Sequence, residues 1–225
     1  MYMYAGYEID TWEPRIDHDV ISSGVQYQMA RSQAEQEEVV KQTGVKYSPL
    51  HTLKYFSPVK DVIIDPMHNL FLGIAKTALR TWKDRKLLMD DTCKAIQSKV
   101  NSIIVLRDVG RIPSKLASGF SSMTADEWRL WTCVYSAITL RDALPPEHRL
   151  CWDLFVRAYT AFCSKVITPS LCDYGQECMM SFCAKFQELY GNAACVPNMH
   201  FACHLSQYLL DHGPAYGFWL FPLRG

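Results

Sequence analysis

The feature that most constrains this chain is an apolar stripe of helical period that follows Pro66. Its members recur at i, i+3, i+4, i+7, i+8 and i+11, the spacing of a helix that packs on a core: Phe71, Ile74, Ala75, Ala78, Leu79 and Trp82. Proline suits the first helical turn, where its missing N–H would have no partner in any case. The sequence therefore predicts a core-packed helix from residue 66.

Further helices are predicted on the C-terminal side of this one. One covers about 90–106, and a loop rich in Gly, Pro and Ser follows it at 108–122. Thr124 and Glu127 form a capping-box pattern before an almost wholly apolar helix, which we expect to be central. Another helix opens at Pro169 and ends before Gly191. Asn198 is expected to cap a last helix that runs through Leu210 to Gly213.

The helix that starts at Pro145-Pro146-Glu147 is expected to bury a single stripe, made of Leu150, Leu154, Ala158, Phe162 and Val166. With at most one or two short strands elsewhere, the fold class is mainly α, an irregular helical bundle. No unit of 20–50 residues repeats, so a solenoid is not expected.

The first part of the chain has a different character. Residues 1–30 show no clean period, whereas 32–44 reads as a short polar helix between Ser32 and Gly44. Pro49 and Pro58 exclude a continuous helix after it, and Val59–Ile64 favours a short strand. We therefore expect an irregular N-terminal arm with one short helix at 1–58, and a helical domain at 59–225.

Composition excludes several classes of protein. Lys plus Arg and Asp plus Glu both number 23, so the whole chain is not drawn to nucleic acid or to an anionic membrane. No window approaches about 18 uninterrupted apolar residues, and the N-terminus does not read as a signal peptide. We expect a soluble, intracellular protein with no membrane partner. The nine cysteines include no C-x-x-C pair, so neither a disulfide framework nor a cysteine zinc module is expected.

Asp65 and His68 lie three residues apart at a predicted helix start and can share the face of its first turn. One interpretation is structural: Asp65 caps the helix and His68 is a partly buried polar residue. The other is that both are metal ligands. His200 and His204 stand at i and i+4 on the last predicted helix, a spacing that lets two imidazoles share a metal.

These four residues define a candidate metal site of one carboxylate and three imidazoles, which suits zinc. Nothing in the sequence shows that the two segments meet. The pattern H-x-x-x-H has no Glu beside its first His, so it lacks the general base of a metalloprotease helix. No P-loop, G-x-S-x-G or G-x-G-x-x-G occurs, and we assign no catalytic residue.

Two local groups of basic residues are candidates for phosphate contact. One lies at a predicted helix end and consists of Arg80, Lys83, Arg85 and Lys86. The other flanks the 108–122 loop and consists of Arg107, Arg111 and Lys115. The alternative is that each set is a solvated helix terminus, where cations favour the C-terminal end of the dipole.

Taken together, four stretches resemble the transposases of CACTA-type (En/Spm) DNA elements, in the order of that family. They are GVKYSPLHTLKYFSPVKDVIIDPMHNLFLGIAK, GRIPSKLASGFSSMTADEWRLW, LPPEHRLCWDLFVRA and FQELYGNAACVPNMHFACHLSQYLLDHGPAYGFWLF. The resemblance covers about 10–221, and D-P-M-H-N-L-F-L-G and P-N-M-H-x-x-x-H are its most specific parts. It implies a nuclear protein and the helical insertion region of a ribonuclease-H-like transposase.

Such transposases cut and join DNA with a D, D, E triad that holds two metal ions, and in-line phosphoryl displacement needs all three acids. The segment with the first two aspartates has no counterpart here, and Arg224 stands where the family has its glutamate. The resemblance therefore implies a fragment truncated at its C-terminus, without strand transfer and without a Mg²⁺ requirement. It also implies that His200 and His204 are the remaining half of a zinc site.

Three functional hypotheses follow. The first is a transposase-derived fragment that is catalytically inactive but retains DNA contact. The second is a domesticated helical module that binds a protein partner or self-associates. The third, an active nuclease, requires Asp61, Asp65 and an acid such as Glu188 to converge, and no spacing in the sequence supports it.

Overall fold

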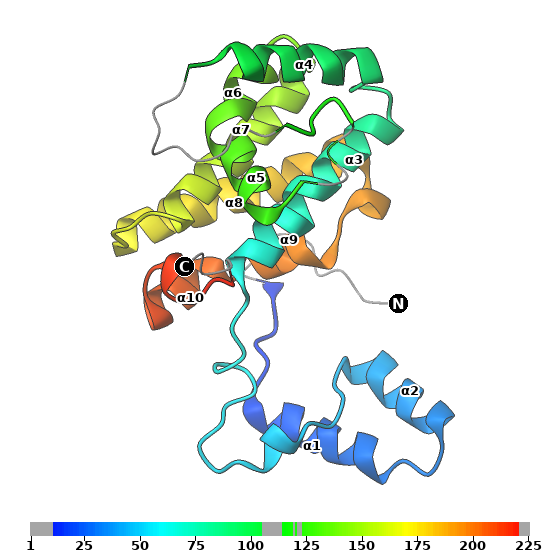
Figure 1. Cartoon of the computed structure of the whole chain (residues 1–225). Helices are drawn as coiled ribbons and strands as arrows, with labels where there is room; N and C mark the ends of the chain where they lie inside the picture. The colour runs from blue at the N-terminus through cyan, green and yellow to red at the C-terminus, as the bar shows by residue number, and fades with distance from the viewer. Residues whose placement is uncertain (1–10, 105–113, 119, 121–122, 221–225) are drawn as a thin grey trace. The chain divides into compact units, whose positions relative to one another are not determined.

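The computed structural model describes residues 11–104, 114–118, 120 and 123–220 (Figure 1). Over those ranges the chain is mainly helical and forms no β-strand, which confirms the mainly α fold class. The chain divides into two compact units, Met1–Ile63 and Ile64–Gly225. This boundary lies five residues beyond the expected one at 58/59. No helix in the described part is both long and apolar enough to cross a bilayer.

The first unit contains more helix than the sequence predicts. Besides α2 (Gln33–Thr43) and the 3₁₀ turn η2 (Pro49–Thr52), it has α1 (Asp17–Met29), so the expectation of one short helix in an irregular arm was wrong. Tertiary contacts support α1 where the sequence has no apolar stripe. The Asp17 carboxylate accepts hydrogen bonds from the Ser57 hydroxyl at 2.9 Å and the Val59 amide at 3.1 Å.

The helix at 32–44 is confirmed with both of its expected ends. The Ser32 hydroxyl accepts from the Glu35 amide, and Gly44 ends α2 at φ 72°. The strand expected at 59–64 does not form. A turn occupies the region instead, in which the Asp61 carboxylate accepts from the Ser57 amide and the Ser57 hydroxyl from the Lys60 amide. The Lys60 amide is thereby bonded within the turn and is not available to a β-ladder.

The second unit is centred on a pair of long helices that lie side by side, α7 (Pro146–Phe162) and α8 (Pro169–Tyr190) (Figure 1). The stripe predicted for α7 is confirmed at Ala158 and Phe162, which are buried, and is wrong at its two ends. Leu150 is 60% exposed, and Val166 lies beyond the helix and is 70% exposed. The buried face also includes the large rings of the helix, which the predicted aliphatic spacing left out. It is made of Cys151, Trp152, Phe155, Ala158, Tyr159, Ala161 and Phe162.

The helix predicted from residue 66 is confirmed, with an irregular first half. It begins with the π-helical segment η3 (Met67–Ala75) and continues as α3 (Lys76–Asp84). Its apolar stripe is buried, from Phe71 to Trp82. The helix expected at 90–106 is α4 (Asp90–Ser102) in the structure. Most of the loop predicted at 108–122 lies outside the described residues.

The predicted central helix forms as three consecutive pieces, α5 (Ala125–Leu130), the π-helical η5 (Trp131–Tyr135) and α6 (Ser136–Thr139). The capping box is confirmed, with Thr124 accepting from the Glu127 amide and Glu127 accepting from the Thr124 amide. Trp128, Trp131 and Tyr135 are buried, as expected for a central helix.

The last predicted helix is divided in two. After the 3₁₀ turn η6 (Asn192–Ala194), α9 (Pro197–Ala202) and α10 (Leu205–His212) are separated at Cys203 and His204, and a final 3₁₀ turn, η7 (Ala215–Gly217), follows. Asn198 does not cap α9, because the helix already begins at Pro197. At the break, the Gln176 side chain of α8 donates to the Cys203 carbonyl at 2.7 Å.

Aromatic rings connect the helices of this unit. Trp152 of α7 contacts Trp82 of α3 at 5.2 Å between ring centroids and Trp131 of η5 at 5.6 Å. The Trp82 indole also donates to the Tyr190 hydroxyl of α8 at 2.7 Å. That hydroxyl lies 2.6 Å from Nδ1 of His148. The Tyr190 hydroxyl therefore joins α3, α7 and α8 through Trp82 and His148.

Close approach of α7 and α8 depends on Gly175, and this gives a testable prediction. A Cβ at Gly175 would lie 2.6 Å from Cε1 of Phe162. We expect Gly175→Ala to lower the free energy of unfolding by about 1–2 kcal/mol, because overpacking outweighs the gain in helix propensity. The matched control is Gly217→Ala, where a Cβ meets nothing within 4 Å. Urea unfolding checks the pair, and equal stabilities would contradict the packing argument.

Candidate functional site

The two most specific sequence motifs meet in the structure, although they lie about 130 residues apart. The Asn69 side-chain amide of η3 donates to the Asn198 carbonyl of α9 at 3.0 Å. One turn later, a Cβ at Gly73 would lie 2.4 Å from Nδ2 of Asn198. Only glycine leaves room for the Asn198 side chain there, so D-P-M-H-N-L-F-L-G and P-N-M-H form one packed surface.

Asp65 starts the helix, as its structural interpretation predicts. Its carboxylate accepts from the Met67 amide at 3.3 Å and the His68 amide at 3.1 Å, the pattern of a side chain that caps the first turn. It also accepts from the Leu220 amide at 2.9 Å, which ties a distant segment to this helix end. Asp65 is therefore an N-cap with an additional tertiary partner.

His68 lies against the carboxylate that caps its own helix. Its Nδ1 contacts Oδ2 of Asp65, and its side chain is 58% exposed, whereas that of Asp65 is 15% exposed. The contact orients the ring and leaves its other nitrogen, Nε2, as the atom through which His68 could bind a ligand. The structure thus shows Asp65 as an N-cap residue and His68 hydrogen-bonded to it.

His200 and His204 form a close pair across the break between α9 and α10. Their Nε2 atoms are 3.3 Å apart, and their rings meet edge to face with centroids 4.9 Å apart. Burial lowers the pKa of His204, and the neighbouring His200 lowers it further. Both causes favour the neutral imidazole, which is the form that binds a metal ion.

The spacing of the two Nε2 atoms fits two positions of a tetrahedral zinc ion. At the usual Zn–N distance of about 2.0–2.1 Å, two tetrahedral ligands are about 3.3–3.4 Å apart. Across the described residues, however, no three side chains of His, Cys, Asp or Glu are grouped so that they could hold a metal ion. The predicted combination of Asp65, His68, His200 and His204 is therefore not a formed site in the described part of this structure.

The first group of basic residues lies at the end of α3, and its members differ in what they contact. Arg85 donates to the Tyr190 carbonyl at 2.7 Å, and its guanidinium lies over the Tyr190 ring. Arg85 therefore contacts the C-terminal end of α8. Lys83 lies 3.7 Å from a carboxylate oxygen of Asp90. Arg80 and Lys86 are exposed. Of the second group, Lys115 is exposed, while Arg107 and Arg111 lie outside the described residues.

The three acids of the nuclease hypothesis each have a local role. Asp61 accepts from the Ser57 amide, Asp65 caps η3, and Glu188 pairs with Lys185 at 2.9 Å. Asp61 belongs to the first unit, and the other two belong to the second. Nothing in their contacts supports a shared metal centre.

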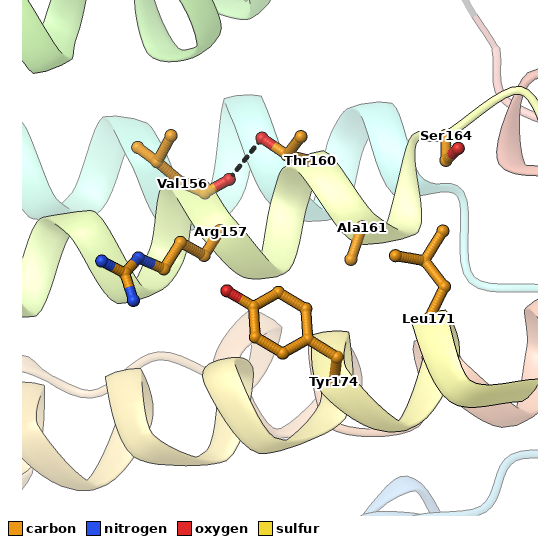
Figure 2. A pocket seen from close by; sticks show the side chains of 7 residues that line it. All are labelled: Val156, Arg157, Thr160, Ala161, Ser164, Leu171 and Tyr174. Atoms are coloured by element: carbon orange, nitrogen blue, oxygen red, sulfur yellow. Dashed lines mark hydrogen bonds between the residues drawn. The ribbon is translucent and has the colours of Figure 1, made fainter.

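A shallow pocket of about 340 Å³ lies between α7 and α8, and the sequence did not indicate it (Figure 2). It is lined by Val156, Arg157, Thr160, Ala161, Ser164, Leu171 and Tyr174. Figure 2 shows the Tyr174 hydroxyl turned toward the side of Arg157, while the Thr160 hydroxyl donates to the Val156 carbonyl at 2.7 Å. The lining combines apolar side chains with the guanidinium of Arg157 and the hydroxyls of Thr160, Ser164 and Tyr174.

Sequence reasoning missed Asn69 and Gly73, and it expected Asn198 only as a helix cap. Both Asn69 and Gly73 belong to the D-P-M-H-N-L-F-L-G motif, whose titratable members are Asp65 and His68. A glycine inside a strongly apolar helix was the available signal, because it often marks a close approach. Comparison with protein-family models, with curated proteins and with solved structures gives no match for this chain.

The lowered pKa of His204 predicts how stability depends on pH. The unfolded chain takes up this proton near pH 6.5, whereas the folded protein takes it up only at lower pH. The unfolded state then binds more protons, so the free energy of unfolding falls as pH is lowered through this region. His204→Gln should reduce that fall.

The measurement is urea unfolding at a series of pH values from neutral to mildly acidic, with a chelator present. The matched control is His18→Gln, since His18 is an exposed histidine. An unchanged pH profile in His204→Gln would contradict the prediction.

Proposed function

We propose that this chain is a helical region of CACTA-type transposase descent that contacts DNA in the nucleus and does not cut it. The observation that carries the proposal is the contact between its two most specific motifs, made by Asn69, Gly73 and Asn198. Direct packing between the two motifs gives a physical reason for both of them to occur in one chain.

The proposal assigns no strand cleavage to the chain. When the chain is compared with the transposases that it resembles, Arg224 stands at the position of the glutamate in the D, D, E triad. A guanidinium cannot coordinate Mg²⁺, and two-metal phosphoryl transfer requires carboxylate ligands. The only zinc ligands that the proposal assigns are His200 and His204. Two imidazoles are half of the usual four-ligand site, so this pair by itself would bind zinc weakly.

DNA contact is assigned to the exposed basic face of α3. Lys76 and Arg80 are both exposed and lie one helical turn apart, so they project from the same face. Lys86 adds an exposed cation beyond the end of the helix. The formal charge of the whole chain is zero, so DNA binding must come from such a local set and must be sensitive to salt.

Fluorescence anisotropy with a short DNA duplex tests this function. With about three phosphate contacts, affinity should fall about 40-fold between about 50 and 200 mM salt. The double variant Lys76→Glu, Arg80→Glu should bind more weakly and lower the salt slope by about 2. Lys165→Glu is the control, because Lys165 is an exposed lysine on the segment after α7. No binding at the lower salt concentration, or equal slopes for the two variants, would refute the proposal.

A second candidate function, protein interaction, is favoured by the first unit. Among its described residues, 11–63, only Gly24 and Val45 are buried. Large apolar side chains remain exposed, among them Met29 at 77% and Tyr55 at 91%. A unit with so little buried apolar surface gains stability from covering these side chains with a partner or a second copy.

Light scattering over a range of protein concentrations tests self-association. We expect a mass above the monomer at high concentration, reduced in Met29→Glu because a charge replaces an exposed apolar side chain. Lys41→Glu, on α2 of the same unit, is the control. A monomer mass throughout, together with no protein co-purified from nuclease-treated extract, would exclude this function.

A further inference from the structure

Two cysteines from different helices meet in the core of the second unit. Sγ of Cys183, on α8, lies 3.9 Å from Sγ of Cys203, at the break between α9 and α10. Both sulfur atoms also face the Met199 carbonyl, at 3.8 Å from Cys183 and 3.2 Å from Cys203. The sulfur atoms are near van der Waals contact, and about 2 Å separates this arrangement from a covalent bond.

The position of Cys203 provides the freedom that bond formation would need. It is the residue after the last turn of α9, and α10 begins only at Leu205. A residue between two helices can move its backbone without breaking a long run of helical hydrogen bonds. Cys183, in contrast, lies within the 22-residue α8. Formation of the disulfide would therefore move Cys203 toward Cys183, which the long helix holds in place.

We infer that Cys183 and Cys203 are an oxidation site at which a small peroxide forms an intramolecular disulfide between α8 and the α9–α10 break. In the first step, the Cys203 thiolate attacks hydrogen peroxide, and its S–O bond forms as the O–O bond breaks and hydroxide leaves. In the second, Cys183 sulfur displaces the sulfenic oxygen as water, and the S–S bond forms. In total, two thiols are oxidised and one peroxide is reduced to two waters.

Burial determines both the order of the steps and the class of oxidant. Cys183 is 0% and Cys203 is 3% exposed, so a water-sized peroxide can reach the pair during local opening, whereas a bulky disulfide cannot. Cys203 lies at the break between two helices and is slightly exposed, whereas Cys183 is fully buried within α8, so peroxide that enters during local opening reaches Cys203 first. The reaction should therefore be slow, and selective for peroxide over oxidised glutathione.

The test treats the reduced full chain with hydrogen peroxide, quenches it, alkylates free thiols in denaturant and maps the peptides. We expect a linked peptide that contains Cys183 and Cys203 and is about 2 Da lighter than its two reduced halves. Cys195, which is more exposed, reports that the dose was sufficient. Oxidised glutathione should leave the pair reduced, and the linked protein should have a higher Tm.

Two variants keep the inference falsifiable. In Cys183→Ser, Cys203 should stop at the sulfenic acid and be trapped by dimedone. In Cys203→Ser, Cys183 should remain open to alkylation, and circular dichroism checks that both variants fold. The inference is overturned if both thiols stay reduced after Cys195 has been oxidised, or if Cys203 proceeds to sulfinic acid while Cys183 remains a thiol.

Discussion

The second unit depends on a continuous contact of aromatic rings that no single helix could make. Trp152 lies at its centre, against Trp82 on one side, Trp131 on another and Phe155 along its own helix. From Phe155 the contact continues through Phe182 and Phe186 of α8 to Tyr190, whose hydroxyl returns to Trp82. Large rings bury much apolar area per residue, and the edge-to-face arrangements add specificity. Because the contact closes on itself, α3, α7 and α8 hold one another in place.

The candidate site is built on this framework rather than within it. Trp82 anchors the end of the helix that begins at Asp65, and α8 supports the break beside His204 through Gln176. The Asn69–Asn198 hydrogen bond and the small volume of Gly73 then bring the two motif segments together. Each motif thus contributes packing residues as well as titratable ones.

Much of the second unit could be predicted from sequence, and the errors share a physical cause. Capping and terminating residues such as Thr124, Glu127 and Gly191 act locally, so the predicted helix ends hold in the structure. The buried face of α7 could not be read from aliphatic spacing, because tertiary packing selected the face with Trp152, Phe155 and Tyr159. A side chain of α8 donates to the carbonyl at the Cys203 break, and Asp17 of α1 accepts from a distant turn. The contact between the two motifs likewise joins residues that are far apart in the sequence, so it could not be predicted from local patterns.

The hydrogen bond from the Leu220 amide to Asp65 spans 155 residues and has a consequence for synthesis of the protein. A ribosome releases the first helix of the second unit long before it has made residue 220. Until then, the oxygen of Asp65 that Leu220 will occupy has only local amides and water as partners. Local interactions form early, and a contact of such long range is completed late. The nascent helix start therefore remains open to other donors for most of the time that the ribosome needs to make the unit.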